Sequence, residues 1–381
     1  MNAELIKLIF TTASIERWND IPRPFKFIEL DKQAHEMIIA YILGKYENID
    51  FIKLINLFIA GVLYRAVLTD LKSPVYQYLR KHKGKELDEF VLSKLKNIAD
   101  EELLEYVEIY NNTDCIERRI LKAASYLASK WEFEFIYNFA HNSYGIEEIN
   151  KSLEDELEDF YDLEGVRILA LRKKAYDFIS LCGNLRFQKR WANTPRVPET
   201  SVLGHMGFVA IMSFLFTKLY GGNEHKLYYN FFTGLFHDLP EALTRDIIAP
   251  VKQGVAGLDE ILKEYENMLI ETKILPLAPK PIQKELKILI TDEFADKLIT
   301  DHGYKKVDVA EDLLGTKGID GSLVKAADHF AAFIEALMSI KHGIKSPELI
   351  NAIKVLQNKY KNKKIYSIDL SQFFNERYFD E

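Results

Sequence analysis

Apolar residues recur at spacings of three and four over most of the chain, which is the pattern of amphipathic helices. The clearest such segments are residues 35–46, 51–64, 87–110, 120–139, 202–220 and 323–340. Stretches that alternate polar and apolar residues, as a half-buried strand requires, are short and isolated. The pattern therefore predicts an all-α fold.

Residues 146–165 interrupt this pattern, because Glu and Asp occur throughout and apolar anchors are few. Such a segment is typical of a solvated helix or of a linker between two halves. A chain of 381 residues is long enough for about two domains. We therefore expect one domain at residues 1–160 and a second at residues 172–381.

Composition narrows the class of protein. Apolar residues make up 48% of the chain, which excludes intrinsic disorder. A net charge of −7, from 50 basic and 57 acidic residues, disfavours non-specific binding of nucleic acid. The two cysteines, Cys115 and Cys182, provide no disulfide framework and indicate a reducing compartment.

The chain offers no clear membrane or export signal. Its longest uncharged apolar runs, residues 54–64 and 206–217, are shorter than the ~20 residues of a membrane-spanning helix. The first residues contain acidic side chains and no small-residue cleavage site, unlike a secretion signal. We expect a cytoplasmic protein that binds neither membranes nor nucleic acid. Its oligomeric state stays open, with a homodimer as one option.

The two halves share short motifs in the same order. Arg17-Trp18 and Arg190-Trp191 begin the series, and each is followed by a Pro-Arg pair. Further matches, in chain order, pair residues 34–35 with 204–205, 61–65 with 234–238, 73–77 with 249–253, and 121–126 with 324–329. Because the order is kept while the loop lengths vary, the motifs predict a tandem duplication.

Four residues of the second half are candidate metal ligands: His205, the adjacent pair His237 and Asp238, and Asp328. A lone histidine such as His205, at the head of an apolar helix, is more often a core residue than a ligand. Asp328, however, lies in a helix that must be largely buried, where a carboxylate needs a partner such as a metal ion. Two imidazoles and two carboxylates suit Mn, Fe, Co, Ni or Zn better than Ca.

Charged residues near these positions are candidates for catalysis and substrate binding. Glu241 shares a helical face with His237 and Asp238, from which it can orient or deprotonate water. Asp246 follows near the C-terminal end of this helix and could contact a substrate hydroxyl or a second ion. Glu241 and Asp246 equally fit the exposed surface of a helix. The basic candidates for phosphate contacts are Arg190, Lys252 and Lys325. Each such residue is more often only a surface charge, and Lys325 could simply pair with a nearby carboxylate.

Taken together, His205, His237-Asp238 and Asp328 resemble the ligand set of the HD-domain metal-dependent phosphohydrolases. The bacterial 5′-deoxynucleotidase branch is similar in further blocks of sequence. These blocks are Arg190-Trp191 with His205 fifteen positions after the Arg, residues 237–246 followed by Pro250-Val251-Lys252, and residues 322–328. The resemblance covers roughly residues 175–345.

The resemblance implies that the four candidates named above bind the metal and that Glu241 activates water. It also implies that Arg190 and Trp191 hold the phosphate and shape the nucleotide site, while Asp246 contacts the sugar or the surroundings of its phosphate. We therefore expect a phosphohydrolase that acts on (deoxy)nucleoside 5′-monophosphates and uses a divalent transition metal.

Two departures from the family pattern bear on the substrate. Gly204 precedes the first histidine where the family often has an acid, and residues 274–281 and 303–321 look like extra loops. A nucleoside triphosphate, a cyclic dinucleotide or an alarmone are therefore alternative substrates. A non-catalytic scaffold that senses nucleotides is an alternative of another class.

The first copy lacks most of the ligand set. At the positions of the four ligands the sequence alignment gives His35, Tyr64, Arg65 and Ser125. A tyrosine phenol titrates at ~10 and is a poor ligand at neutral pH, and an arginine repels a cation. We expect a degenerate HD-like domain without a metal site. Its role is structural or, alternatively, that of a regulatory nucleotide site that keeps Arg17 and Trp18.

Overall fold

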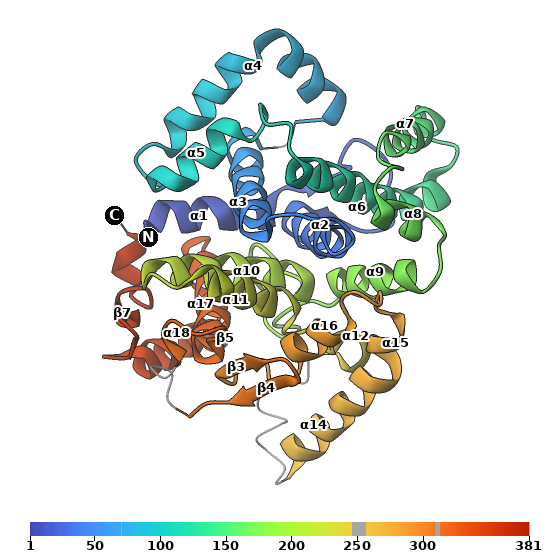
Figure 1. Cartoon of the computed structure of the whole chain (residues 1–381). Coiled ribbons are helices and arrows are strands. Elements are labelled where there is room, and N and C mark those ends of the chain that lie inside the picture. The colour runs from blue at the N-terminus through green and yellow to red at the C-terminus, as the bar shows by residue number, and fades with distance from the viewer. Residues whose placement is uncertain (70, 246–256, 309–312, 381) are drawn as a thin grey trace. The chain divides into compact units, whose positions relative to one another are not determined.

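The computed structural model describes residues 1–69, 71–245, 257–308 and 313–380 (Figure 1). The chain divides by its internal packing into two units. Unit 1 comprises Met1–Val166 together with Arg377–Glu381, and unit 2 comprises Arg167–Glu376. Helices dominate both units and strands are few and short, so the predicted all-α class is confirmed.

Unit 1 is a set of helices with one short pair of antiparallel strands. Its elements are α1 (Ala3–Thr11), the 3₁₀ turn η1 (Thr12–Ser14), β1 (Glu16–Arg17), β2 (Phe27–Ile28), α2 (Glu29–Gly44), α3 (Phe51–Leu68), α4 (Ser73–Leu95), α5 (Glu101–Ile109), α6 (Ile116–Ala140) and α7 (Ile146–Glu158). Helix α8 (Glu164–Ala170) contains the boundary with unit 2. Every residue of α2 is buried, which makes it the central helix of this unit.

Two segments of unit 1 refine the expectations from the sequence. The single helix expected over residues 87–110 is two helices, because α4 ends at Leu95 and the Asp100 side chain caps α5 by accepting the Leu103 N–H. The acidic segment after residue 145 is helical rather than a linker. Ile146 and Leu153 on α7 pack into a core cluster with Phe133 of α6.

Unit 2 contains helices and two small antiparallel sheets. Its helical elements are α9 (Lys174–Asn184), η2 (Leu185–Phe187), α10 (Val202–Leu219), α11 (Glu224–Phe236), α12 (Glu241–Thr244), α14 (Leu258–Leu269), the π-helix η3 (Ile270–Ile274), α15 (Leu275–Leu277), α16 (Gln283–Ile290), α17 (Gly321–Lys341), α18 (Pro347–Tyr360), η5 (Leu370–Gln372) and η6 (Glu376–Phe379), which reaches into unit 1. Its strands are β3 (Lys297–Thr300), β4 (Gly303–Lys306), β5 (Gly318–Ile319), β6 (Lys364–Ile365) and β7 (Ile368–Asp369).

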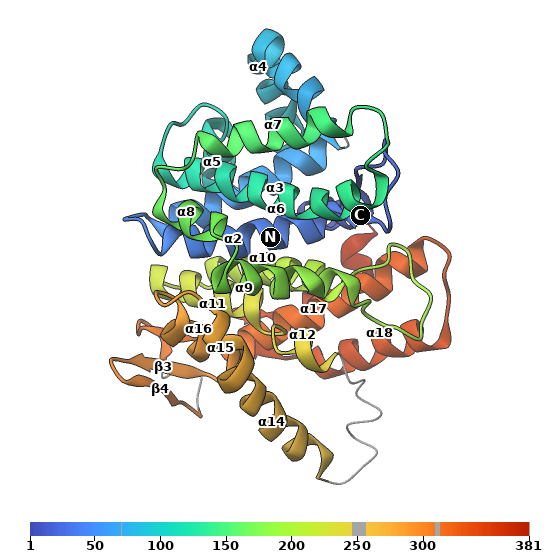
Figure 2. The ribbon, with the colours of Figure 1, turned by 90° about the vertical axis from the view of Figure 1, so that its right-hand side faces the viewer.

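Helix α10, which is almost wholly buried, packs against both α11 and α17. The close approach of α10 and α11 requires a glycine, because a Cβ on Gly234 would lie 2.9 Å from the Cα of Ala210. The hairpin of β3 and β4 lies beside α16 (Figure 2). The segments expected as extra loops therefore carry structure of their own: α15 in the first, and β4 and β5 in the second.

Helices α3 and α10 are each 18 residues long and apolar enough to cross a membrane by length and composition alone. However, 61% of the residues of α3 and 89% of those of α10 are buried. A buried core helix of a globular protein passes the same test of length and composition. Two such helices are therefore weak evidence for a membrane protein.

The start of each unit repeats the same local structure. The pairing of Glu16 with Ile28 recurs as a bridge between Lys189 and Ser201, each 173 residues later. The Glu29 N–H donates to the Ile15 carbonyl over 2.9 Å, and the Val202 N–H donates to the Gln188 carbonyl over the same distance and at the same offset. Helices α2 and α10 therefore begin in the same register.

This register corrects one part of the sequence alignment. With the offset of 173 carried into the helices, Lys32 stands at the position of His205, and His35 stands at the position of Phe208. The alignment of His35 with His205 is therefore wrong by three residues, about one helical turn. The match of a single Ala-His pair with a Gly-His pair did not fix the register of the two helices.

Candidate metal centre

The predicted ligands come from three helices of unit 2. His205 lies in the first turn of α10, whose N-terminus is capped by the Ser201 hydroxyl accepting the Gly204 N–H over 3.0 Å. His237 follows the last residue of α11, and Asp328 lies in the buried second turn of α17. Residues that are 123 positions apart in the chain are thus brought into contact.

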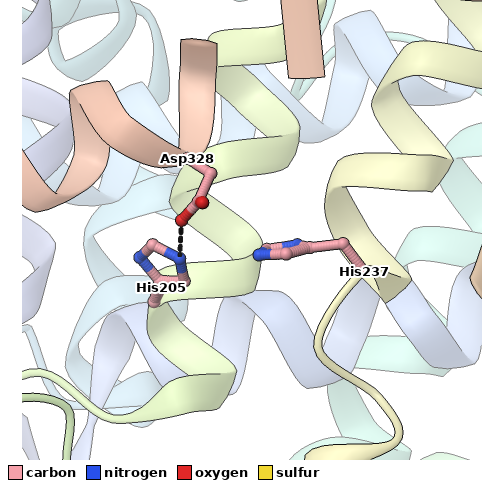
Figure 3. Close-up of side chains that lie close together, drawn as sticks. All are labelled: His205, His237 and Asp328. Carbon is pink, nitrogen blue, oxygen red and sulfur yellow. Dashed lines mark hydrogen bonds and ion pairs between the residues drawn. The ribbon is translucent and has the colours of Figure 1, made fainter. Parts of the chain in front are cut away.

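His205, His237 and Asp328 form a buried cluster in which the side chains point toward one another (Figure 3). Each residue offers one ligand atom, and these atoms all lie within 4.8 Å of one another. The Nε2 atom of His205 is 3.0 Å from Oδ1 of Asp328. Three nitrogen and oxygen donors at this spacing can surround one divalent transition metal ion.

Asp238, the fourth predicted ligand, lies at the edge of this cluster. Its Oδ2 atom is 3.1 Å from Nε2 of His237 and 3.9 Å from Nε2 of His205. Asp238 can therefore reach an ion held between the two imidazoles.

The hydrogen bonds of His237 fit a metal ligand. Its Nδ1 atom lies 2.8 Å from the carbonyl of Gly234, so this nitrogen carries the hydrogen and donates it. The lone pair is then on Nε2, which is buried and lies 3.1 Å from Oδ2 of Asp238, an acceptor to which a nitrogen without a hydrogen cannot donate. A buried imidazole lone pair that faces carboxylate oxygens is an arrangement that a metal ion completes.

Both carboxylates of the site are ionised at neutral pH. Burial by itself would raise the pKa of Asp238, but the neighbouring His237 and His205 lower it to about 2. Burial is likewise outweighed at Asp328, where Lys325 and His205 hold the pKa well below its usual value. Two buried negative charges next to two imidazoles match the charge of a divalent cation.

Arg190 brings a positive charge to the same site. Its side chain is 15% exposed, with Nη1 3.8 Å from Oδ2 of Asp238 and Nε 3.8 Å from Oε2 of Glu335. The Nε atom is buried and has no hydrogen-bond partner among the described residues. A buried guanidinium whose hydrogen-bonding capacity is incompletely used is suited to an anionic ligand.

The remaining candidates occupy different surroundings. Lys325 donates to Oδ2 of Asp328 over 2.7 Å and lies over the ring of Phe294. It therefore pairs with a nearby carboxylate, which was one of the roles expected from the sequence. Glu241 begins α12 and is half-buried, and its charge contributes to raising the pKa of Arg190. The predicted residues Asp246 and Lys252 lie outside the described residues.

The structure adds a residue that the sequence analysis missed. Glu335 lies on α17, seven residues after Asp328, and is 2% exposed. It accepts the indole N–H of Trp191 over 2.8 Å and the Thr200 hydroxyl over 2.7 Å. A glutamate within an apolar helix, on the same face as Asp328, was the available signal.

Burial would raise the pKa of Glu335, but Arg196 and Arg190 together hold it below its usual range. Glu335 is therefore a buried carboxylate that stays charged beside the cluster.

Comparison with known families is consistent with this geometry. Residues 182–369, which include all four predicted ligands, match the family model described as HD domain. No curated protein matches the chain. Unit 2 therefore contains both the segment that matches the HD domain model and the candidate metal site.

Proposed function

We propose that this HD domain makes the chain a metal-dependent phosphohydrolase that cleaves (deoxy)nucleoside 5′-monophosphates. HD domains are generally hydrolases that bind divalent metals, which supports the reaction class. The observation that carries the proposal is the buried cluster of His205, His237 and Asp328, with the buried Nε2 of His237 aimed into it. The choice of monophosphates rests on the sequence resemblance to the 5′-deoxynucleotidase branch.

Each residue of the site has a chemical role in this proposal. His205, His237, Asp238 and Asp328 hold the ion, which supplies Lewis-acid polarisation of the phosphoryl group and an activated water. Arg190 binds the phosphate oxygens and offsets their charge. Glu241 accepts a proton from the attacking water.

The finer assignments belong to the same proposal. The metal is Mn, Co, Fe, Ni or Zn, because the donor set mixes nitrogen and oxygen. Trp191, Lys252 and Lys325 complete the substrate contacts, and Asp246 assists catalysis at the sugar. The enzyme acts on a small nucleotide in the cytoplasm.

A panel of substrates tests the reaction and its alternatives. We expect metal-replete protein with Mn or Co to release phosphate from dAMP and to act poorly on dGTP and c-di-GMP. Preferred turnover of dGTP or c-di-GMP would move the assignment to another nucleotide. Binding of nucleotide without any turnover would support the scaffold alternative.

We expect Glu241→Gln to keep the metal and lose turnover. The amide preserves the shape of the side chain but cannot take up a proton, so kcat should fall by ~10²–10⁴-fold. Metal content and steady-state kinetics measured on the same preparation check this. Glu199→Gln, at an exposed glutamate paired with Lys189, is the control and should behave as the unmodified chain. A near-normal kcat for Glu241→Gln would remove this residue from the mechanism.

We also propose that unit 1 is a degenerate copy of the HD fold that holds no metal. In the shared register, the four ligand positions carry Lys32, Tyr64, Arg65 and Ser125. The Lys32 ammonium lies 2.5 Å from the Ser125 hydroxyl, just as His205 contacts Asp328 in unit 2. Two cationic side chains at ligand positions repel a metal ion.

The surroundings of Arg17 favour a structural role for this copy over a regulatory nucleotide site. Arg17 donates to Glu29 over 2.8 Å, to Glu132 over 2.9 Å and to the Ser129 hydroxyl over 3.1 Å. Its guanidinium is thus occupied by protein groups. Arg190, in contrast, has Val202 at the position of Glu29 and keeps capacity for an external anion.

Restoring the ligand residues should give unit 1 a metal site. We expect the full chain to contain one ion, and the variant Lys32→His, Tyr64→His, Arg65→Asp and Ser125→Asp to contain two. Elemental analysis, with circular dichroism to verify folding, measures this. Ser125→Ala serves as the control and should leave the content at one. A folded fourfold variant that still holds one ion would contradict the shared geometry.

A further inference from the structure

Glu335 faces two parts of the candidate site with its two oxygens. Oε1, which accepts the Thr200 hydroxyl, lies 3.6 Å from Nδ1 of His205. Oε2, which accepts the Trp191 indole N–H, lies 3.8 Å from Nε of Arg190. One buried carboxylate thus borders both a predicted metal ligand and the predicted phosphate-binding arginine.

His205 needs a partner on the side that faces Glu335. A metal ion on Nε2 leaves the imidazole hydrogen on Nδ1, and a ligating histidine usually donates that hydrogen to a carboxylate or carbonyl. Nδ1 of His205 is buried and has no hydrogen-bond partner among the described residues, and Oε1 of Glu335 faces it at 3.6 Å. A small rotation of either side chain would complete the bond.

Unit 1 carries the same arrangement without the metal ligands. Glu132 accepts the indole N–H of Trp18 over 2.8 Å and pairs with Arg17, as Glu335 does with Trp191 and Arg190. Trp18 and Trp191 both adopt the left-handed backbone conformation, with φ of 55° and 57°, which is uncommon for a tryptophan. The glutamate therefore fixes this loop in both units, and only in unit 2 does it also face a candidate metal ligand.

We propose that Glu335 is a positioning residue that couples the metal centre to the phosphate site: Oε1 orients His205, and Oε2 holds Arg190. This inference rests on the proposed function, because it requires a metal on His205 and an anion on Arg190. It assigns the carboxylate a role beyond fixing the loop. Neutralising it should weaken metal and phosphate binding together.

The test compares Glu335→Gln with its counterpart Glu132→Gln in the full chain. Mn²⁺ affinity is measured by equilibrium dialysis, inorganic phosphate is used as the anionic probe and competitive inhibitor, and thermal unfolding monitors stability. We expect both variants to lose stability, since each loses a buried charged acceptor. Only Glu335→Gln should bind Mn²⁺ ~10–100-fold more weakly and show weaker inhibition by phosphate.

The outcomes separate this inference from the proposed function. Unmodified chain that binds no metal would overturn both. Metal binding by the unmodified chain, with Mn²⁺ affinity equal in Glu335→Gln and Glu132→Gln, would overturn the positioning role alone. If Glu335→Gln does not fold, Thr200→Val removes only the hydroxyl that fixes Oε1. That variant should still weaken Mn²⁺ binding, and unchanged affinity would overturn the inference.

Discussion

We expect the replacement of Asp328 by alanine to remove the proposed metal and to abolish phosphate release with it. The variant lacks a ligand of the buried cluster, and Nε2 of His205 loses its 3.0 Å contact. The Lys325 ammonium loses its carboxylate partner as well, so a positive charge remains beside the vacated ligand position. Because loss of even an outer-shell partner costs ~10–100-fold in metal affinity, we expect a loss above about 100-fold here. Elemental analysis after dialysis, with a phosphate-release assay, measures it.

Ser125→Ala is the matched control for this variant, because Ser125 stands at the same position in unit 1. It should keep both the metal and the activity. Stoichiometric metal in a folded Asp328→Ala variant would remove Asp328 from the ligand set.

Replacing Arg190 by methionine should lower kcat/KM by ~10²–10³-fold and leave the metal in place. Methionine fills a similar volume but cannot donate to phosphate oxygens. The metal should stay because the variant removes a positive charge that lies 3.8 Å from Asp238. Steady-state kinetics with dAMP and elemental analysis on one preparation check both parts.

Arg17→Met provides the comparison for Arg190→Met. It removes the buried cation that pairs with Glu29 and Glu132, which should cost about 3–5 kcal/mol in the free energy of unfolding, although Glu29 keeps Arg65 at 3.4 Å. Per folded molecule, however, kcat/KM should not change. Wild-type kcat/KM in Arg190→Met, or an equal loss in both variants, would show that Arg190 does not bind substrate.

Much of the fold can be predicted from the sequence because the signals for helices lie in residues that are close together in the chain. The spacing of apolar residues predicts the helices. Asp328 is recognisable as a candidate ligand because a carboxylate within a buried helix needs a partner. The structure brings Asp328 together with His205 and His237, as that reasoning required. The break between α4 and α5 was less visible, since its main signal is a single capping aspartate, Asp100.

Other features depend on packing that sequence reasoning could not resolve. The role of Glu335 arises from contacts with residues 135 and 144 positions away, and nothing near Glu335 in the chain indicates them. The sequence alignment placed α2 three residues out of register with α10 because it relied on a single matching histidine. The register was fixed instead by the strand pairing of Glu16 with Ile28. A local motif thus aligned the helices better than their own sequences did.

The position of a bound ion is the decisive measurement for a metal centre in unit 2. Anomalous diffraction from crystals of the Mn²⁺-loaded full chain locates that ion without reference to any assay. We expect one peak per chain, within coordination distance of Nε2 of His205, Nε2 of His237 and a carboxylate oxygen of Asp328. A peak elsewhere, or a peak beside Lys32 and Ser125 in unit 1, would contradict this expectation.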